Sequence, residues 1–156
     1  MPWHTIESKI ETAIVRVLTA MGEDELRGVQ ILSRFSGTDL VEPCIQVICP
    51  SAAPDNDDRD DYTGNERVTC EIVVRSHYRD TAPDEHDRIV GVCVDFVYRA
   101  NLTARLNAAA EDMDLTVLLL DSIAVRTNTV DGHNYETRIP FVLLAMPSKQ
   151  GQIGED

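Results

Sequence analysis

Between residues 66 and 100, the spacing of the apolar residues changes from every second position to a helical repeat. Residues 66–76 alternate apolar and polar side chains, which predicts a strand with one buried face and one wetter face. The apolar side is Val68, Cys70, Ile72 and Val74, and the other side is mainly Thr69, Glu71, Arg75 and His77. We expect this strand and the helix that follows it to organise the fold.

That helix is predicted at residues 83–99. Asp80 or Thr81 suits the N-cap, and Pro83 suits the first turn, where its fixed φ and missing N–H cost nothing. The acidic residues that come next, Asp84, Glu85 and Asp87, lie where the helix dipole stabilises carboxylates. The apolar side is wide enough to contact both the sheet and another helix, and it includes Ile89, Val92, Cys93, Phe96 and Ala100.

Two further helices are predicted from the same spacing. Residues 5–21 begin with Thr5 as a candidate N-cap and stop at Gly22. Their apolar stripe is Ile6, Ile10, Ala13, Ile14, Val17, Leu18 and Met21, and their solvent side is expected to carry Glu7, Lys9, Glu11 and Arg16. Residues 102–110 are good helix formers and predict a short helix with Asn101 as its cap.

Extended segments lie before and after the central unit. Residues 44–49 are almost continuously apolar and predict a buried strand closed by Pro50. The long connection at 23–43 is expected to hold a short strand around 29–32. Residues 115–120 are apolar on both sides, which predicts a second buried strand.

The last part of the chain predicts a hairpin. Residues 123–129 continue extended, and Asp131 and Gly132 mark the turn because both residues tolerate a positive φ. The returning strand is expected at residues 133–146. It contains Pro140, which cannot donate to a ladder and therefore predicts a bulge or an edge position.

These elements predict an α+β fold: an antiparallel sheet of about four strands, with a mixed sheet as the alternative, and two main helices packed on one face. Residues 1–147 are expected to form one domain, because the length suits a single core and no linker or repeat divides the chain. The polar residues 148–156 are expected to form a flexible C-terminal tail.

The charge balance is strongly acidic. The 156 residues include 27 Asp and Glu against 14 Lys and Arg, which gives a formal net charge of −13. Such a chain repels nucleic-acid phosphates and anionic membranes, so neither is an expected ligand. No apolar run reaches the length of a membrane span, and the first residues lack the layout of a signal peptide, so we expect no membrane insertion and no export.

Metal binding is not predicted. The four cysteines, Cys44, Cys49, Cys70 and Cys93, fall in apolar patterns and are expected to be buried free thiols in a reducing compartment. A zinc site at Cys44 and Cys49 would need a bend, because an odd separation in a strand sends the two side chains to opposite faces. The histidines are expected at the surface without metal-type spacing; they are His4, His77, His86 and His133.

The acidic segment 51–65 is expected to be a solvated loop between two strands. A calcium loop starting at Asp55 would need an acid or amide at its fifth place and glycine at its sixth, where the chain has Arg59 and Asp60. The sequence has no phosphate-binding glycine loop, nucleophile elbow or zinc-protease motif. The acids after Pro83 are explained by the helix dipole. We therefore expect a protein that acts through its surfaces, with no catalytic site, cofactor or metal.

The elements follow the order helix, strand, acidic loop, strand, helix opened by PDEHDRIVGVCVDFV, short LTARLNAA segment, extended run and final hairpin strand. This order resembles the tail terminator proteins of long-tailed bacteriophages, the family that includes the lambda tail terminator. The resemblance covers residues 6–146. Its strongest pieces are the strand at 66–74 with the helix after it, and the strand at 136–144.

The resemblance implies a small protomer that assembles as a homo-hexameric ring on the head-proximal end of the tail tube. There the ring would stop tube growth, contact the major tail tube protein and present a surface to the head-completion or neck protein. Family members are not enzymes, and DNA passes through the lumen without specific binding. The implied location is the virion tail, after assembly in the host cytoplasm. A strongly acidic ring suits such a lumen because it does not retain phosphates.

By analogy with the family, contacts between subunits or with the tube are expected on the 51–65 loop, the hairpin tip at 127–134 and the C-terminal tail. The candidate interface residues are Asp57, Asp58, Arg59, Asp60, Asp61, Thr127, Asn128, Asp131, Gly132, His133 and Lys149. The acidic loop and the long connection at 23–43 depart from the family pattern.

Three other functions remain open on the residues alone. The chain could be another head-to-tail connector, such as a tail-completion or neck protein. It could be an acidic binding module that mimics DNA, which would bind a nucleic-acid-binding protein in a salt-sensitive way. A small metal-dependent or cysteine enzyme would use a residue such as Cys93 or Asp84. Ring formation would separate the tail terminator from the DNA mimic and from the enzyme.

Overall fold

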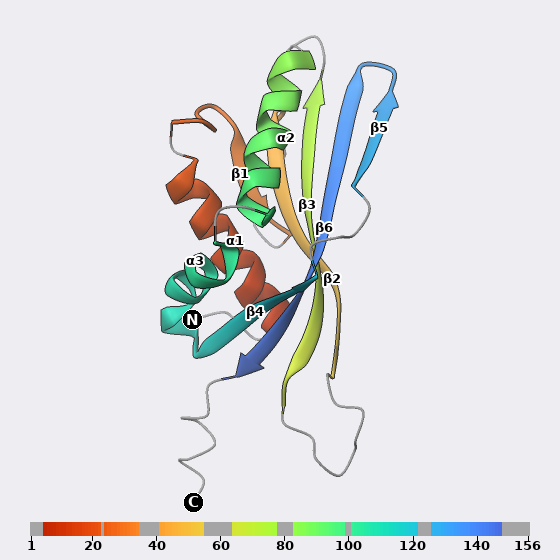
Figure 1. Ribbon diagram of the computed structural model, residues 1–156. Helices are drawn as coiled ribbons and strands as arrows, with labels where there is room; N and C mark the ends of the chain where they lie inside the picture. The colour runs from red at the N-terminus through yellow and green to blue at the C-terminus, as the bar shows by residue number, and fades with distance from the viewer. Residues whose placement is uncertain are drawn as a thin grey trace, which may run out of the picture.

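Figure 1 shows the computed structural model, which describes residues 5–22, 24–34, 41–54, 64–77, 83–98, 101–121 and 126–147. Within these residues the fold is α+β, as predicted, with three α-helices and a six-stranded mixed sheet. The elements are α1 (Ile6–Met21), β1 (Gln30–Ser33), β2 (Cys44–Pro54), β3 (Glu66–His77), α2 (Pro83–Tyr98), α3 (Leu102–Ala109), the 3-10 turn η2 (Glu111–Met113), β4 (Leu115–Asp121), β5 (Thr127–Asp131) and β6 (Asn134–Pro147).

The strands lie in the order β1-β2-β3-β6-β4, and β5 also pairs with β6. β1 runs parallel to β2, and every other pair is antiparallel. The short strand expected around 29–32 is therefore present as β1. The predicted strand number is too low, because the short strands β1 and β5 join the four longer strands in one sheet.

β6 is long enough to pair with two strands along one side. β4 pairs with residues 142–147 and β5 with residues 134–138, so residues 139–141 have no partner there among the described residues. Pro140 lies in this gap, and on the other side it faces Glu71 of β3. The predicted edge position of the strand is wrong, because β6 lies inside the sheet, but Pro140 falls where one side of β6 has no described partner, which suits a residue without an N–H.

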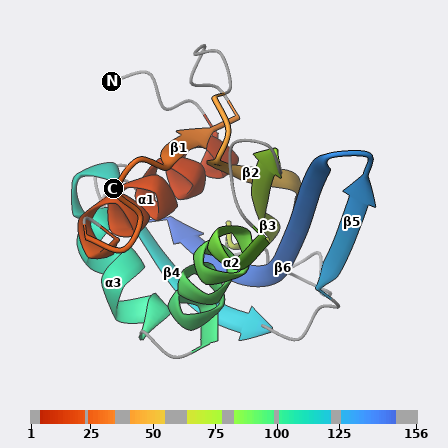
Figure 2. The ribbon, with the colours of Figure 1, turned by 90° about the horizontal axis from the view of Figure 1, so that it is seen from above.

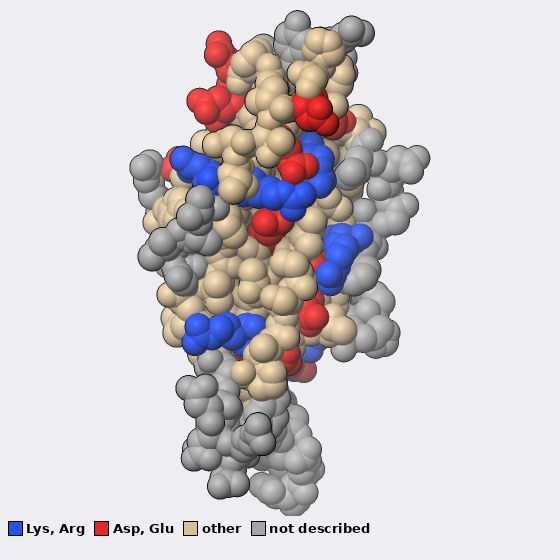
Figure 3. Space-filling view, turned by 90° about the vertical axis from the view of Figure 1, so that its right-hand side faces the viewer, with Lys and Arg blue, Asp and Glu red and all other residues tan. Residues whose placement is uncertain are grey.

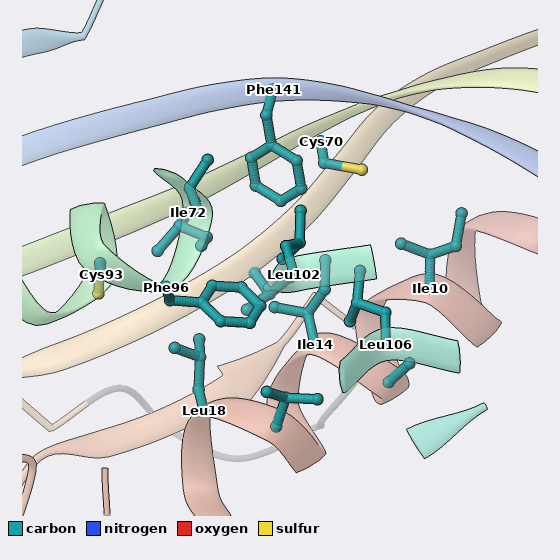
Figure 4. Close-up of a cluster of buried hydrophobic side chains, with 14 of the residues drawn as sticks. Ile10, Ile14, Leu18, Cys70, Ile72, Cys93, Phe96, Leu102, Leu106 and Phe141 are labelled. Carbon is teal, nitrogen blue, oxygen red and sulfur yellow. The ribbon is translucent and has the colours of Figure 1, made fainter. Parts of the chain in front are cut away.

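The helices cover one face of the sheet, and the sheet curves around them (Figure 2). The predicted arrangement of helices on one face is confirmed, with α3 as a third helix. Figure 4 shows how side chains of the three helices meet those of the sheet in one core. Its largest fully buried members include Ile10, Ile14 and Leu18 of α1, Ile89 and Phe96 of α2, Leu106 of α3, and Ile45, Ile72, Ile139, Phe141 and Leu143 of the sheet. All four cysteines are buried free thiols, as predicted.

β3 and α2 form the predicted central unit. α2 begins at Pro83 and carries Asp84 and Glu85 in its first turn. Its buried side is wide, as expected, and consists of Ile89, Val90, Val92, Cys93, Phe96 and Val97. The candidate N-caps Asp80 and Thr81 lie outside the described residues.

Three local predictions are corrected. β2 does not close at Pro50 but continues to Pro54 beyond a register shift between Ile48 and Ser51. β4 is buried on one side only, because none of the described helices covers the face that carries Leu118 and Leu120. Asn101 has a left-handed backbone and makes no side-chain cap, so α3 begins without the predicted capping bond.

Glu11 is the largest correction in the first helix. The Thr5 N-cap of α1 is confirmed, since its side chain accepts from Ser8 N. Glu11 was expected on the solvent side, yet its exposed fraction is 0%. Its carboxylate instead faces the register shift of β2 and the end of β1, where backbone N–H groups lack strand partners.

Candidate functional site

The described part of the predicted interface is the hairpin of β5 and β6. Thr127, Asn128 and Asp131 belong to β5, and Gly132 and His133 connect it to β6. The remaining candidates lie outside the described residues, so their contacts stay predictions; they are Asp57, Asp58, Arg59, Asp60, Asp61 and Lys149.

The hairpin closes with a two-residue turn. Asp131 pairs with Asn134, which leaves Gly132 and His133 as the loop. Gly132 has a φ of 61°, and a glycine at the first loop position is typical of tight hairpins because a side chain there would be strained. The predicted hairpin is confirmed. Asp131, however, lies in the strand, and only Gly132 needs the positive φ.

A chain of hydrogen bonds joins the hairpin to α2 and β3. Thr137 Oγ1 donates to Oδ1 of Asn128 at 2.9 Å. His86 of α2 follows, with Nε2 at 3.0 Å from Thr137 Oγ1 and Nδ1 at 2.7 Å from Ser76 Oγ. Ser76 and Thr137 are both buried. The side chain of Asn128 therefore anchors the hairpin to the body of the protein.

The direction of these bonds sets the tautomer of His86. Thr137 gives its one hydroxyl proton to Asn128, so Nε2 of His86 must carry a proton and donate to Thr137. Nδ1 of the neutral ring then accepts the hydroxyl proton of Ser76. Burial lowers the pKa of His86 below its usual range, although Asp87 acts in the opposite direction. The prediction of a surface histidine is wrong for His86. Its side chain is half-buried, and both of its ring nitrogens are hydrogen-bonded.

We expect the replacement His86→Ala to lower the free energy of unfolding by about 2 kcal/mol at neutral pH, because the hydroxyls of Ser76 and Thr137 lose a buried partner. Stability should also depend on pH. The folded pKa of His86 lies below the unfolded value near 6.5, so its stabilisation is complete above pH 6.5 and declines as the pH falls toward the folded pKa.

Thermal unfolding on either side of pH 6.5 checks both expectations. The variant should lose less stability on acidification than the native protein does. His133→Ala, at the exposed turn of the same hairpin, is the matched control and should change stability by less than about 0.5 kcal/mol. Equal acid sensitivity in the native protein and in His86→Ala would contradict the neutral ring.

Three of the histidines gather at this end of the sheet. The rings of His77 and His133 have centroids 5.9 Å apart, and those of His86 and Tyr135 are 5.6 Å apart. Over the described ranges, no group of three or more His, Cys, Asp or Glu side chains is placed to hold a metal ion. The ring contacts pack the turn end of the hairpin against β3 and α2.

The sheet face away from the helices carries ion pairs that were not predicted from the sequence. Glu136 accepts from Arg75 Nε at 3.1 Å and from Arg138 Nε at 2.8 Å. Nη1 of Arg138 also lies 2.6 Å from Oε1 of Glu71. We call Glu71, Arg75, Glu136 and Arg138 the charged ladder. Figure 3 shows acidic and basic side chains next to one another across the upper part of this side of the molecule.

The charged ladder shields the sheet beneath it. Val73, on the same face, has an exposed fraction of 0% although none of the three described helices lies over it. Burial alone would raise the pKa of Glu136, but hydrogen bonds from Arg138 and Arg75 outweigh it and hold this pKa below its usual range. The signal in the sequence is that the charged residues are an even number of positions apart in each strand, since such residues share a face and can pair across the ladder.

The same face carries an apolar area beside the charged ladder. Leu118 and Leu120 of β4 are 45% and 38% exposed. Leu118 pairs with Leu144 of β6, and Met146 and Val142 lie on the same side of that strand, half-buried. Exposed leucines grouped on a sheet face are typical of a protein contact surface. The face therefore combines a paired charged region with an apolar one.

On the helix side, α1 and α3 form an open hollow of about 640 Å³. Small side chains such as Ala20, Ala108 and Ala109 contribute to its lining. Among the charged residues that line it, Arg16 donates from Nη1 to Asp112 at 2.8 Å and to the carbonyl oxygen of Ala109 at 3.0 Å. These bonds fix α1 against the end of α3.

No protein-family model matches the chain, and no curated protein matches it either. Among the described residues, no helix has both the length and the apolar content needed to cross a bilayer. The resemblance to tail terminators therefore rests on the order and size of the elements alone.

Proposed function

We propose that the chain is a tail terminator: a virion protein that caps the head-proximal end of a phage tail tube as a homo-hexameric ring. The ring ends tube polymerisation and forms the joint to the head-completion or neck protein. The observation that carries this proposal is the order of the elements, with α1 before the sheet, α2 directly after β3, α3 before β4, and a final β5–β6 hairpin. Assembly in the host cytoplasm and a place in the virion tail belong to the same proposal.

The charge of the protein supports a conduit for DNA. Each protomer carries a net charge of −13, so a ring of six repels the phosphate backbone instead of retaining it. The arginines of the charged ladder add little positive potential, because Arg75 and Arg138 are both bonded to carboxylates. DNA would therefore pass without specific binding.

The surface of the protein supports a role in assembly. A ring member needs one surface for its neighbours and others for the tube and the neck. The described part of the chain offers an exposed hairpin, a sheet face with an apolar area, and a hollow on the helix side. These surfaces lie on different sides of one core, which suits a protein with several partners.

A tube-length assay tests the function. The probe is a major tail tube protein of a long-tailed phage, polymerised in vitro with and without the purified protein. We expect the protein to arrest growth, so that tubes become shorter and carry a ring at one end in negative-stain images. An unchanged length distribution, with the protein absent from tube ends, would contradict the proposal. Binding to the neck protein without any effect on tube growth would favour another head-to-tail connector.

A further inference from the structure

The outer edge of β4 is closed by side chains of α3. Asn107 donates from Nδ2 to the carbonyl oxygen of Val117 at 3.1 Å and accepts from Val117 N at 2.7 Å. Thr103 Oγ1 accepts from Leu119 N at 3.2 Å. These bonds replace those that a neighbouring strand would make, so no further strand can add to β4 at these positions.

The far half of β2 is also protected against strand addition. Its outer side has no described strand partner beyond the stretch that pairs with β1. Cys49 N donates to the buried carboxylate of Glu11 at 2.9 Å. Pro50 and Pro54 lack an N–H group and cannot donate to a ladder. Prolines at an edge are typical of strands that must not pair further.

Within the residues that the structure describes, β5 has none of these protections. Its residues are all exposed, and they include neither proline nor lysine. Among the described strands it pairs only with β6, and it forms the right-hand edge of the sheet in Figure 1. In a hairpin closed by two residues, Asp131 and Thr129 bond inward to β6, so the N–H groups of Val130 and Asn128 point outward. Val130 is 66% exposed.

β1 lies at the opposite end of the same row of the sheet. The row runs from Gln30 of β1 through Cys44, Arg75 and Glu136 to Thr129 of β5. Like β5, β1 has no strand on its outer side among the described residues. β1 has four residues and β5 has five, and the alternation of strand directions makes them run in opposite senses. Each copy thus carries two edge strands, β1 and β5, that are similar in length, opposite in direction and located at the two ends of the same row of the sheet.

We propose that β5 of one copy adds in antiparallel pairing to the outer edge of β1 in a second copy. The joint is head-to-tail, so repeating it generates a closed ring in which the five-stranded row continues from copy to copy. This inference rests on the proposed ring function and specifies the contact that builds the ring. It also explains why the other edges are closed, since a ring needs only one joint.

The first test removes one outward N–H. Val130→Pro takes away an edge donor without breaking the ladder to β6, whereas Val130→Thr keeps the donor and the β-branched shape. Native mass spectrometry should show rings for Val130→Thr and protomers for Val130→Pro, with a similar Tm for both. A ring that persists in Val130→Pro with unchanged stability contradicts the joint.

The second test locates the contact and does not depend on how Val130→Pro folds. The natural cysteines are all buried, so a short bis-maleimide should react mainly with introduced thiols. Leu32 and Thr127 lie in one row of the sheet, through Gln46, Val73 and Arg138. The double variant Leu32→Cys, Thr127→Cys should give a ladder of cross-linked copies on a denaturing gel, and neither single variant should.

The outcomes separate the joint from the proposed function. Cross-linked dimers of Thr127→Cys alone would mean that β5 pairs with β5 of the second copy, which overturns the proposal. A ring without the cross-linked ladder would refute the joint and leave the terminator function standing. A protein that never forms rings would refute both.

Discussion

Replacing Glu11 by alanine is expected to lower the free energy of unfolding by about 3 kcal/mol, because a buried carboxylate that serves several donors is lost. Its Oε2 atom accepts from Cys49 N at 2.9 Å and lies 3.3 Å from Nη2 of Arg34. Its Oε1 atom accepts from Arg34 N at 3.2 Å. The carboxylate thus ties α1 to the end of β1 and to the register shift of β2. Without it, the N–H of Cys49 is left unpaired in the core.

The measurement is urea unfolding at neutral pH. Glu7→Ala is the matched control, because Glu7 lies one turn earlier on the same helix and is only half-buried. The control should change stability by less than about 0.5 kcal/mol. A Glu11→Ala loss no larger than that of Glu7→Ala would show that the carboxylate does not hold the sheet.

The stability lost in Glu11→Ala is also expected to depend on pH. Burial raises the pKa of Glu11, and the bonds from Cys49 and Arg34 only partly offset it. A carboxyl with a raised folded pKa gives its full stabilisation below its unfolded pKa and loses part of it as the pH rises through the folded pKa. The cost of Glu11→Ala should therefore be larger near pH 4.5 than at neutral pH. A cost that shrinks on acidification would contradict the raised pKa.

Phe96→Ala is expected to cost about 4 kcal/mol, which is close to the whole stability of a marginal domain. Phe96 has an exposed fraction of 0%. Figure 4 shows its ring between Ile72 of β3 and Leu18 of α1, beside Ile14. The ring joins two helices and the sheet, so its removal leaves a cavity that no single element can fill by shifting.

Thermal unfolding of Phe96→Ala beside Tyr98→Ala separates burial from aromatic character. Tyr98 is on the same helix and is 41% exposed. Its replacement should cost less than about 1 kcal/mol. Similar losses for the two variants would mean that α2 does not depend on the packing of Phe96 between α1 and β3.

The central unit was predictable because its residues repeat with a clear period. β3 alternates from Val68 to Val74 except at Val73, and α2 combines Pro83, early acids and a wide apolar side. Each signal arises from local geometry and burial, which one sequence records directly. β5 gives a weaker signal because every residue in it is exposed: the sequence predicts an extended segment at 123–129 and the turn at Gly132, whereas the strand is Thr127–Asp131.

The sequence shows which side of α1 carries Glu11, but it does not show that the side chain is buried. Glu11 precedes Leu18 by seven residues, almost two full turns, so the two side chains lie on nearly the same side of α1. Its charge suggested solvent, but the partners that allow its burial come from β1 and β2. Long-range partners of this kind are not visible in a local pattern. The same holds for His86 and Asn128, which are joined through Thr137 of a distant strand.

The candidate site, too, was predictable from the sequence only in part. Thr127, Asn128, Asp131, Gly132 and His133 were predicted as one hairpin, and they form one. The charged ladder and the protected edges arise only when strands far apart in the sequence become neighbours. The same holds for the edge of β5. It points to a contact with a second copy only because the structure shows that the edges of β4 and β2 are closed.

Native mass spectrometry of the purified protein, alone and with the tail tube protein, tests the ring most directly. We expect a hexamer of the 17.4 kDa protomer, with an abundance that rises with protein concentration. Intermediate oligomers should be rare once the ring is closed. A strict monomer over the whole concentration range, both alone and in the presence of the tube protein, would contradict the proposed function.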